Sequence, residues 1–218
     1  NAAILSCADR SPRLPCVDTH AHVFTRDLSV TTQRRYTPDY DALPADYLAQ
    51  LDAHGLGRGV LVQPSFLGTD NSYLVQALRD HPDRLRGVAV VDPRISPAEL
   101  AELDSAGVVG VRLNLIGLPT PPLSSMPWRG LLNRVNNLGW HVEVHAPAER
   151  LAGMLPDLLA AGCRVVVDHF GRPGAAGDIT PLLRHADTAR VWVKLSAPYR
   201  NWADDDAGRA GARHAARL

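Results

Sequence analysis

The chain is poor in cysteine and has no excess of charge of either sign, and each shortage removes a class of protein. Of its 218 residues three are cysteines, Cys7, Cys16 and Cys163, with no short paired spacing. So few argue against a disulfide framework and against a cysteine zinc site, and suit a reducing compartment. Basic and acidic residues number 23 each, so the formal net charge is zero. This balance gives no electrostatic ground for binding nucleic acid or a membrane surface.

Long apolar runs are also missing. The longest are strand-sized, so no segment is expected to span a membrane. Residues 1–6 carry no basic group and too short an apolar stretch for a signal peptide, which favours a cytoplasmic protein. With 45% hydrophobic and 21% charged residues, the composition is that of a soluble globular chain. We expect an irregular leader over residues 1–13 and a single domain over residues 14–218.

What the sequence does contain is a regular alternation of strand-like and helix-like segments, roughly 25 residues apart, typical of parallel βαβ units. A doubly wound sheet would place a glycine-rich phosphate loop after its first strand, and here Thr19-His20-Ala21-His22 occupies that position. We therefore predict an α/β fold of the TIM (β/α)8 type, truncated after the seventh strand. The predicted strands are residues 14–17, 59–63, 87–91, 108–113, 141–145, 164–168 and 191–195.

The pair His20 and His22 stands at the end of the first predicted strand. In an extended strand, residues i and i+2 point to the same face, so the two imidazoles are expected to share one space. Two such rings suit either a metal site or hydrogen bonding to a substrate oxygen. An isolated pair of this kind would also be accounted for by exposed polar side chains, or by a buried histidine with its hydrogen bonds satisfied.

Polar and titratable groups follow nearly every predicted strand. A barrel enzyme carries its chemistry at the carboxyl ends of its strands, so these groups are expected to form one site. They are His20 and His22, then Gln63 and Ser65, Asp92, Arg112 and Asn114, His145, Asp168 with His169 and Arg172, and finally Lys194, Ser196, Tyr199 and Arg200.

The stretch Val17-Asp18-Thr19-His20-Ala21-His22 resembles the first-strand signature of the amidohydrolase superfamily, in its amidohydrolase-related (type 2) branch. Three further stretches are similar to lactonases of the 2-pyrone-4,6-dicarboxylate lactonase kind. They run from Val62-Gln63-Pro64-Ser65 to Gly68-Thr69-Asp70-Asn71, over Asp168-His169-Phe170-Gly171-Arg172-Pro173, and over Lys194-Leu195-Ser196-Ala197-Pro198-Tyr199-Arg200.

The resemblance implies a hydrolase that opens a small anionic cyclic ester, or a related carbonyl compound, by attack of water. His20, His22 and His169 would polarise the scissile carbonyl. Arg112 and Arg172 would bind substrate carboxylates. Lys194 would bind the substrate or hold a neighbouring carboxylate. The remaining substrate-binding residues implied are Ser65, Thr69, Ser196 and Tyr199.

Two departures from that pattern leave alternatives open. His145 stands where metal-dependent relatives place a ligand, so His20, His22 and His145 could hold one zinc or manganese ion, as in a metal-dependent decarboxylase or amidohydrolase. An eighth strand with its Asp does not follow the seventh, so the 218 residues themselves are expected to turn over weakly or not at all. A non-catalytic barrel fragment that binds carboxylate ligands is the third hypothesis. The partner expected is a small carboxylate substrate, with a homo-oligomer left open.

Overall fold

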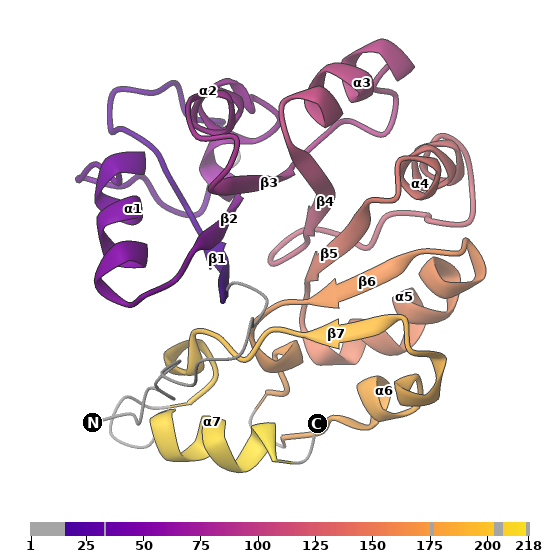
Figure 1. The fold of residues 1–218 in the computed structure, drawn as a ribbon. Helices are drawn as coiled ribbons and strands as arrows, with labels where there is room; N and C mark the ends of the chain where they lie inside the picture. Colours follow the sequence, from indigo (N-terminus) through magenta and orange to yellow (C-terminus); the bar gives the residue numbers. More distant parts are fainter. Residues whose placement is uncertain (1–15, 33, 175–176, 203–206, 217–218) are drawn as a thin grey trace, which may run out of the picture. The chain divides into compact units, whose positions relative to one another are not determined.

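The computed structural model describes residues 16–32, 34–174, 177–202 and 207–216 (Figure 1). The predicted leader, residues 1–13, lies outside the described residues. The chain divides into two compact units, one made of Asn1–Val91 with Ala98–Val109, the other of Asp92–Pro97 with Gly110–Leu218. The strands are parallel and follow one another in chain order, seven in the part of the chain described. The α/β fold of the TIM type is thereby confirmed.

The first unit is built on three strands and the helices between them. Strand β1 (Val17–Ala21) pairs with β2 (Arg58–Val62), and β2 pairs with β3 (Leu85–Ala89). Helices α1 (Pro44–Ala53) and α2 (Ser72–Asp80) connect them, and most of α3 (Pro97–Ser105) belongs here too.

Strand β1 lies further along the chain than the predicted residues 14–17. It pairs through Val17, Asp18 and Ala21, and its register shifts between Asp18 and Ala21. Such an irregularity turns side chains away from the simple alternation of a strand. His20 therefore lies within the irregular part of the strand, and His22 comes just after it.

The long polar segment after β1 is closed at its base by an antiparallel bridge. Phe24 N donates to Ala42 O at 2.9 Å, and Ala42 N donates to Phe24 O at 2.8 Å. Phe24, one residue of the bridge, packs with Phe66 and Leu67 in a small buried cluster. The described residues at the base of this segment are thus attached to the residues that follow β2.

In the second unit, four strands pair in parallel. They are the main part of β4 (Val108–Asn114), β5 (His141–His145), β6 (Arg164–Val167) and β7 (Val191–Val193). Asn114 pairs with His145, and Val144 pairs with Val167, so the carboxyl ends of these strands are level. The helices are α4 (Trp128–Asn137), α5 (Ala148–Ala160), α6 (Thr180–Leu183) and α7 (Ala207–Ala215), drawn around these strands in Figure 1.

Helix α5 shows why this unit forms a core. Leu151, Leu155 and Leu158 recur at helical spacing and are fully buried, as is Met154 between them. Cys163, which follows this helix, is a buried free thiol, whereas Cys16 is disulfide-bonded, contrary to what the cysteine count suggested. Among the described residues, no helix is long and apolar enough to cross a membrane.

Candidate active site

In the first unit, His20 and His22 lie edge to face, with ring centroids 5.0 Å apart. The Nδ1 atom of His22 is 2.6 Å from the backbone oxygen of Val62 at the end of β2. Because a carbonyl oxygen only accepts hydrogen bonds, Nδ1 must carry the proton. In its neutral form, the His22 ring would then carry a lone pair at Nε2, which is suited to accepting a proton or binding a metal.

The loop after β2 is held by a buried glutamine. The side chain of Gln63 donates to Asp70 O at 2.6 Å and to Gly68 O at 3.3 Å. Of the two predicted substrate-binding residues on this loop, Ser65 is half-buried and Thr69 is exposed. Gln63 thus fixes the backbone from which both hydroxyls project.

Asn71 ties the same loop to the segment after β3. Its amide donates to Thr69 O at 2.9 Å and to Val90 O at 2.8 Å, and its oxygen accepts from Val90 N at 3.1 Å. Three hydrogen bonds to backbone groups account for the burial of this polar side chain.

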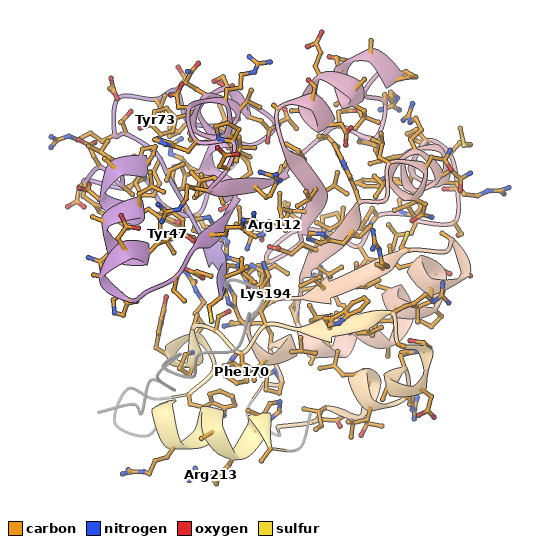
Figure 2. The ribbon with its side chains drawn as sticks, in the orientation of Figure 1. Tyr47, Tyr73, Arg112, Phe170, Lys194 and Arg213 are labelled. Atoms are coloured by element: carbon orange, nitrogen blue, oxygen red, sulfur yellow. The ribbon has the colours of Figure 1, made fainter. Side chains whose placement is uncertain are left out.

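The second unit contains a closed ring of four buried charges, with Arg112 on β4, Glu143 on β5, and Asp168 and Lys194 directly after β6 and β7. Arg112 Nε lies 3.2 Å from Glu143 Oε1, and Arg112 Nη2 lies 2.8 Å from Asp168 Oδ2. Lys194 Nζ contacts Glu143 Oε2 and lies 3.7 Å from Asp168 Oδ1. Both carboxylate side chains are 0% exposed. Arg112 and Lys194 are labelled in Figure 2.

This ring defines what its two cations contact. Arg112, predicted to bind substrate carboxylates, is paired with two carboxylates of the chain itself. Lys194 occupies the second of its two expected roles, because it holds neighbouring carboxylates. Burial, and next the charge of Asp168, raise the pKa of Glu143 to about 7, while Lys194 and Arg112 oppose that shift.

His169 lies in a backbone turn whose conformation few residues other than glycine adopt. Four consecutive residues have positive φ: His169 (52°), Phe170 (59°), Gly171 (74°) and Arg172 (50°). Three of them are not glycine, and each such residue costs on the order of 1 kcal/mol. Strain of this kind is typical of functional sites, where the fold holds a side chain in a required position.

The His169 ring is fixed by neighbours on other strands. Its Nδ1 lies 2.9 Å from Ser196 Oγ beyond β7, and its ring meets that of His145 edge to face at 4.9 Å. The His169 backbone oxygen accepts a hydrogen bond from Asn201 Nδ2 at 2.9 Å. Two of the predicted histidines and one predicted serine are thus together in the second unit.

Arg172 ends the same turn with a partly exposed side chain. Its guanidinium donates to Arg200 O, and burial, together with the nearby Arg200 charge, lowers the pKa of Arg172. Arg200 also lies 5.7 Å from the centroid of the Tyr199 ring. The Tyr199 side chain is 61% exposed, so its ring is accessible to solvent.

The predicted sets draw on both units. His20 and His22 belong to the first unit, and His145 and His169 to the second, so the catalytic trio and the three-histidine metal site both stay predictions. Sequence reasoning missed Glu143, although its charge within the strand sequence His-Val-Glu-Val-His was a usable signal.

The chain belongs to the amidohydrolase family, whose model matches residues 17–218. A 2-pyrone-4,6-dicarboxylate hydrolase of Comamonas testosteroni is 35% identical over 192 residues, covering 84% of this chain. Two solved structures, both of candidate 2-pyrone-4,6-dicarboxylic acid hydrolases, are similar over most of this chain. That from Acinetobacter baumannii, with citric acid bound, is 40% identical with a TM-score of 0.88 over 93% of this chain and 78% of its own. The structure from Pseudomonas putida is 46% identical with a TM-score of 0.84, and the match covers 94% of this chain and 77% of that one.

The chain is shorter than these relatives. The match spans 63% of the length of the Comamonas testosteroni protein. The family and the fold apply to the chain itself, whereas the activity of the longer relatives is a matter for proposal.

Proposed function

We propose that the chain hydrolyses a small cyclic ester that carries carboxylate groups. The observation that carries this proposal is the strained turn from His169 to Arg172, which presents an imidazole and a guanidinium three residues apart. An imidazole can polarise an ester carbonyl, and a guanidinium matches the geometry of a carboxylate. The names of the relatives supply the substrate class, a pyrone dicarboxylate, which is a lactone of this description.

In the proposed reaction, a water oxygen attacks the lactone carbonyl carbon and the ring C–O bond breaks. The water gives up two protons, one to the departing ring oxygen and one to solvent, and the product is an open-chain carboxylate. His169 would stabilise the negative charge that develops on the carbonyl oxygen. Arg172 would orient the ring through a carboxylate substituent. His20 and His22 are the predicted further members of this site.

The proton position of His22 favours a metal-dependent version as the second candidate. A ring whose Nδ1–H is donated to a backbone carbonyl is the usual state of a metal-ligating histidine. His20, His22 and His145 would hold the ion, and a divalent metal supplies Lewis-acid polarisation of a carbonyl and a more acidic water. In that case Lys194 and Arg112 would hold the carboxylates of Glu143 and Asp168 in their ion pairs.

The direct test is hydrolysis of 2-pyrone-4,6-dicarboxylate, followed by the loss of ring absorbance, for the wild type and for His169→Gln. The substitution removes the imidazole ring, and the Gln amide is not held where the ring nitrogen lies. Loss of a positioned donor to the developing oxyanion typically lowers kcat by roughly 100- to 1000-fold. His185→Gln, on the segment after α6, is the matched control and should retain the wild-type rate. Parallel assays after chelation, with metal analysis of the purified protein, separate the two candidates.

Three outcomes decide between the hypotheses. Turnover that survives chelation and is lost in His169→Gln supports the proposed mechanism. Turnover lost on chelation and restored by added zinc or manganese favours the metal-dependent candidate. Because the 218 residues alone are expected to turn over weakly, the same assays are run on a form extended through an eighth strand. Binding of the dicarboxylate without turnover even in that extended form would overturn both and favour a carboxylate-binding protein.

A further inference from the structure

The hydrogen bond between His169 and Ser196 differs in kind from that between His22 and Val62. A carbonyl oxygen fixes the proton of His22 at Nδ1, because it can only accept. A serine hydroxyl can donate or accept, so the 2.9 Å contact from Ser196 Oγ to His169 Nδ1 is compatible with either neutral tautomer. Which tautomer is present decides what the other ring nitrogen of His169 offers to a substrate.

The two possibilities have opposite chemistry. If the hydroxyl of Ser196 donates to Nδ1, the ring proton lies on Nε2 and His169 can donate a hydrogen bond to a carbonyl oxygen. If Nδ1–H donates to the hydroxyl, Nε2 carries a lone pair and His169 is an acceptor or a metal ligand. Carbonyl polarisation by a neutral ring needs the first arrangement.

The surroundings of Ser196 favour the first arrangement. Among the described residues, Ser196 Oγ forms its hydrogen bond with His169 Nδ1. A half-buried hydroxyl proton is best satisfied by an acceptor within reach, and the Nδ1 lone pair is that acceptor.

The backbone holds both partners in place. Phe170 N, the amide after His169, donates to Lys194 O at 2.9 Å, and Lys194 N donates to Val167 O at 2.8 Å. Ser196 stands two residues beyond Lys194, so the same stretch that anchors the turn also carries the hydroxyl. Asn201 Nδ2 closes the arrangement through its bond to the His169 oxygen.

We propose that Ser196 is a positioning residue, which sets the Nε2–H tautomer of His169 and so makes its ring a hydrogen-bond donor to the substrate carbonyl. This inference deepens the proposed lactone hydrolysis and rests on it for its catalytic consequence. It assigns Ser196 to the histidine, in place of the direct contact with the substrate ring that the resemblance implied.

The test reads the tautomer directly. Long-range proton–nitrogen correlation spectra of histidine-labelled protein distinguish Nε2–H from Nδ1–H, and the His169 signals are assigned by their loss in His169→Gln. We expect Nε2–H in the wild type. Ser196→Ala should lower kcat by up to about tenfold, the worth of one hydrogen bond, with little change in KM. Ser196→Thr, which keeps a hydroxyl, should restore kcat, and Ser124→Ala on an exposed loop is the control.

Each result bears on one claim. Nδ1–H in the wild type, or an unchanged kcat in Ser196→Ala, would overturn the proposal. A mixed or altered tautomer in Ser196→Ala, reversed in Ser196→Thr, supports the assignment of Ser196 even if no protein form opens the lactone. In that last case, the failure belongs to the proposed function and not to the pairing of Ser196 with His169.

Discussion

Replacing Lys194 by methionine takes one of the two cations out of the buried charge ring. The side chain keeps a similar length, so the change is mainly one of charge. With Glu143, Asp168 and Arg112 ionised, the ring goes from a net charge of zero to one uncompensated negative charge. Both carboxylates are 0% exposed, so water cannot replace the missing ammonium group.

The expected loss is large and depends on pH. Removing one partner of a buried ion pair typically costs about 3–5 kcal/mol. In a chain of this size, that loss lowers Tm by roughly 6–20 °C. Because the pKa of Glu143 is already raised to about 7, this carboxyl can take up a proton as the pH falls. The deficit of Lys194→Met should therefore be greatest near pH 8 and shrink below pH 7.

The assay is urea unfolding at pH 8 and at pH 5.5, followed by fluorescence, with Arg184→Met on the surface as the control. The double variant Lys194→Met/Glu143→Gln leaves the Arg112–Asp168 pair intact at 2.8 Å. It should recover most of the lost stability. The reasoning is refuted if Lys194→Met loses less than about 1 kcal/mol at pH 8, or if the double variant is less stable than the single one.

Three further predictions concern stability. The native pKa of Glu143 is raised above its unfolded value of 4.5 to about 7, so the wild type should lose stability relative to Glu143→Gln as the pH rises between those two values. Urea midpoints of the two proteins that change with pH in the same way would contradict this. Gly171→Ala places a Cβ 2.7 Å from Leu182 Cδ1 at a φ of 74° and should cost about 1–3 kcal/mol, so an unchanged Tm would count against the strained turn. Asn71→Ala removes the three hydrogen bonds that the Asn71 amide makes to Thr69 O, Val90 O and Val90 N. We expect urea unfolding to show a loss of stability of about 1–3 kcal/mol. A loss below about 0.5 kcal/mol would contradict the contribution assigned to these hydrogen bonds.

Much of the fold follows from local sequence signals. The strand predicted over residues 141–145, where apolar and polar residues alternate, agrees to the residue with β5. The strand before the histidines was placed too early, because its bounds depend on pairing with Arg58, Gly59 and Leu61 of β2. Pairing between distant segments cannot be read from a single stretch of sequence.

The candidate site was predictable as a set of residues and not as a set of contacts. Polar groups at strand ends identified Arg112, His169 and Lys194, because parallel strands bring their carboxyl ends together. That Arg112 faces two carboxylates of the chain depends on Glu143, whose partners lie on other strands. The left-handed turn at His169 could not be predicted either, because positive φ is uncommon for residues other than glycine and the sequence carries no local signal for it here.

The measurement that tests the central claim most directly is the preference for a charged substrate, compared between the wild type and Arg172→Ala. It is the ratio of kcat/KM for 2-pyrone-4,6-dicarboxylate to that for the same ring without carboxylates. If Arg172 binds a substrate carboxylate, the wild type should prefer the charged ring by roughly tenfold or more, and Arg172→Ala should lose most of that preference. Equal rates on both rings in the wild type, or an unchanged preference in Arg172→Ala, would contradict the account.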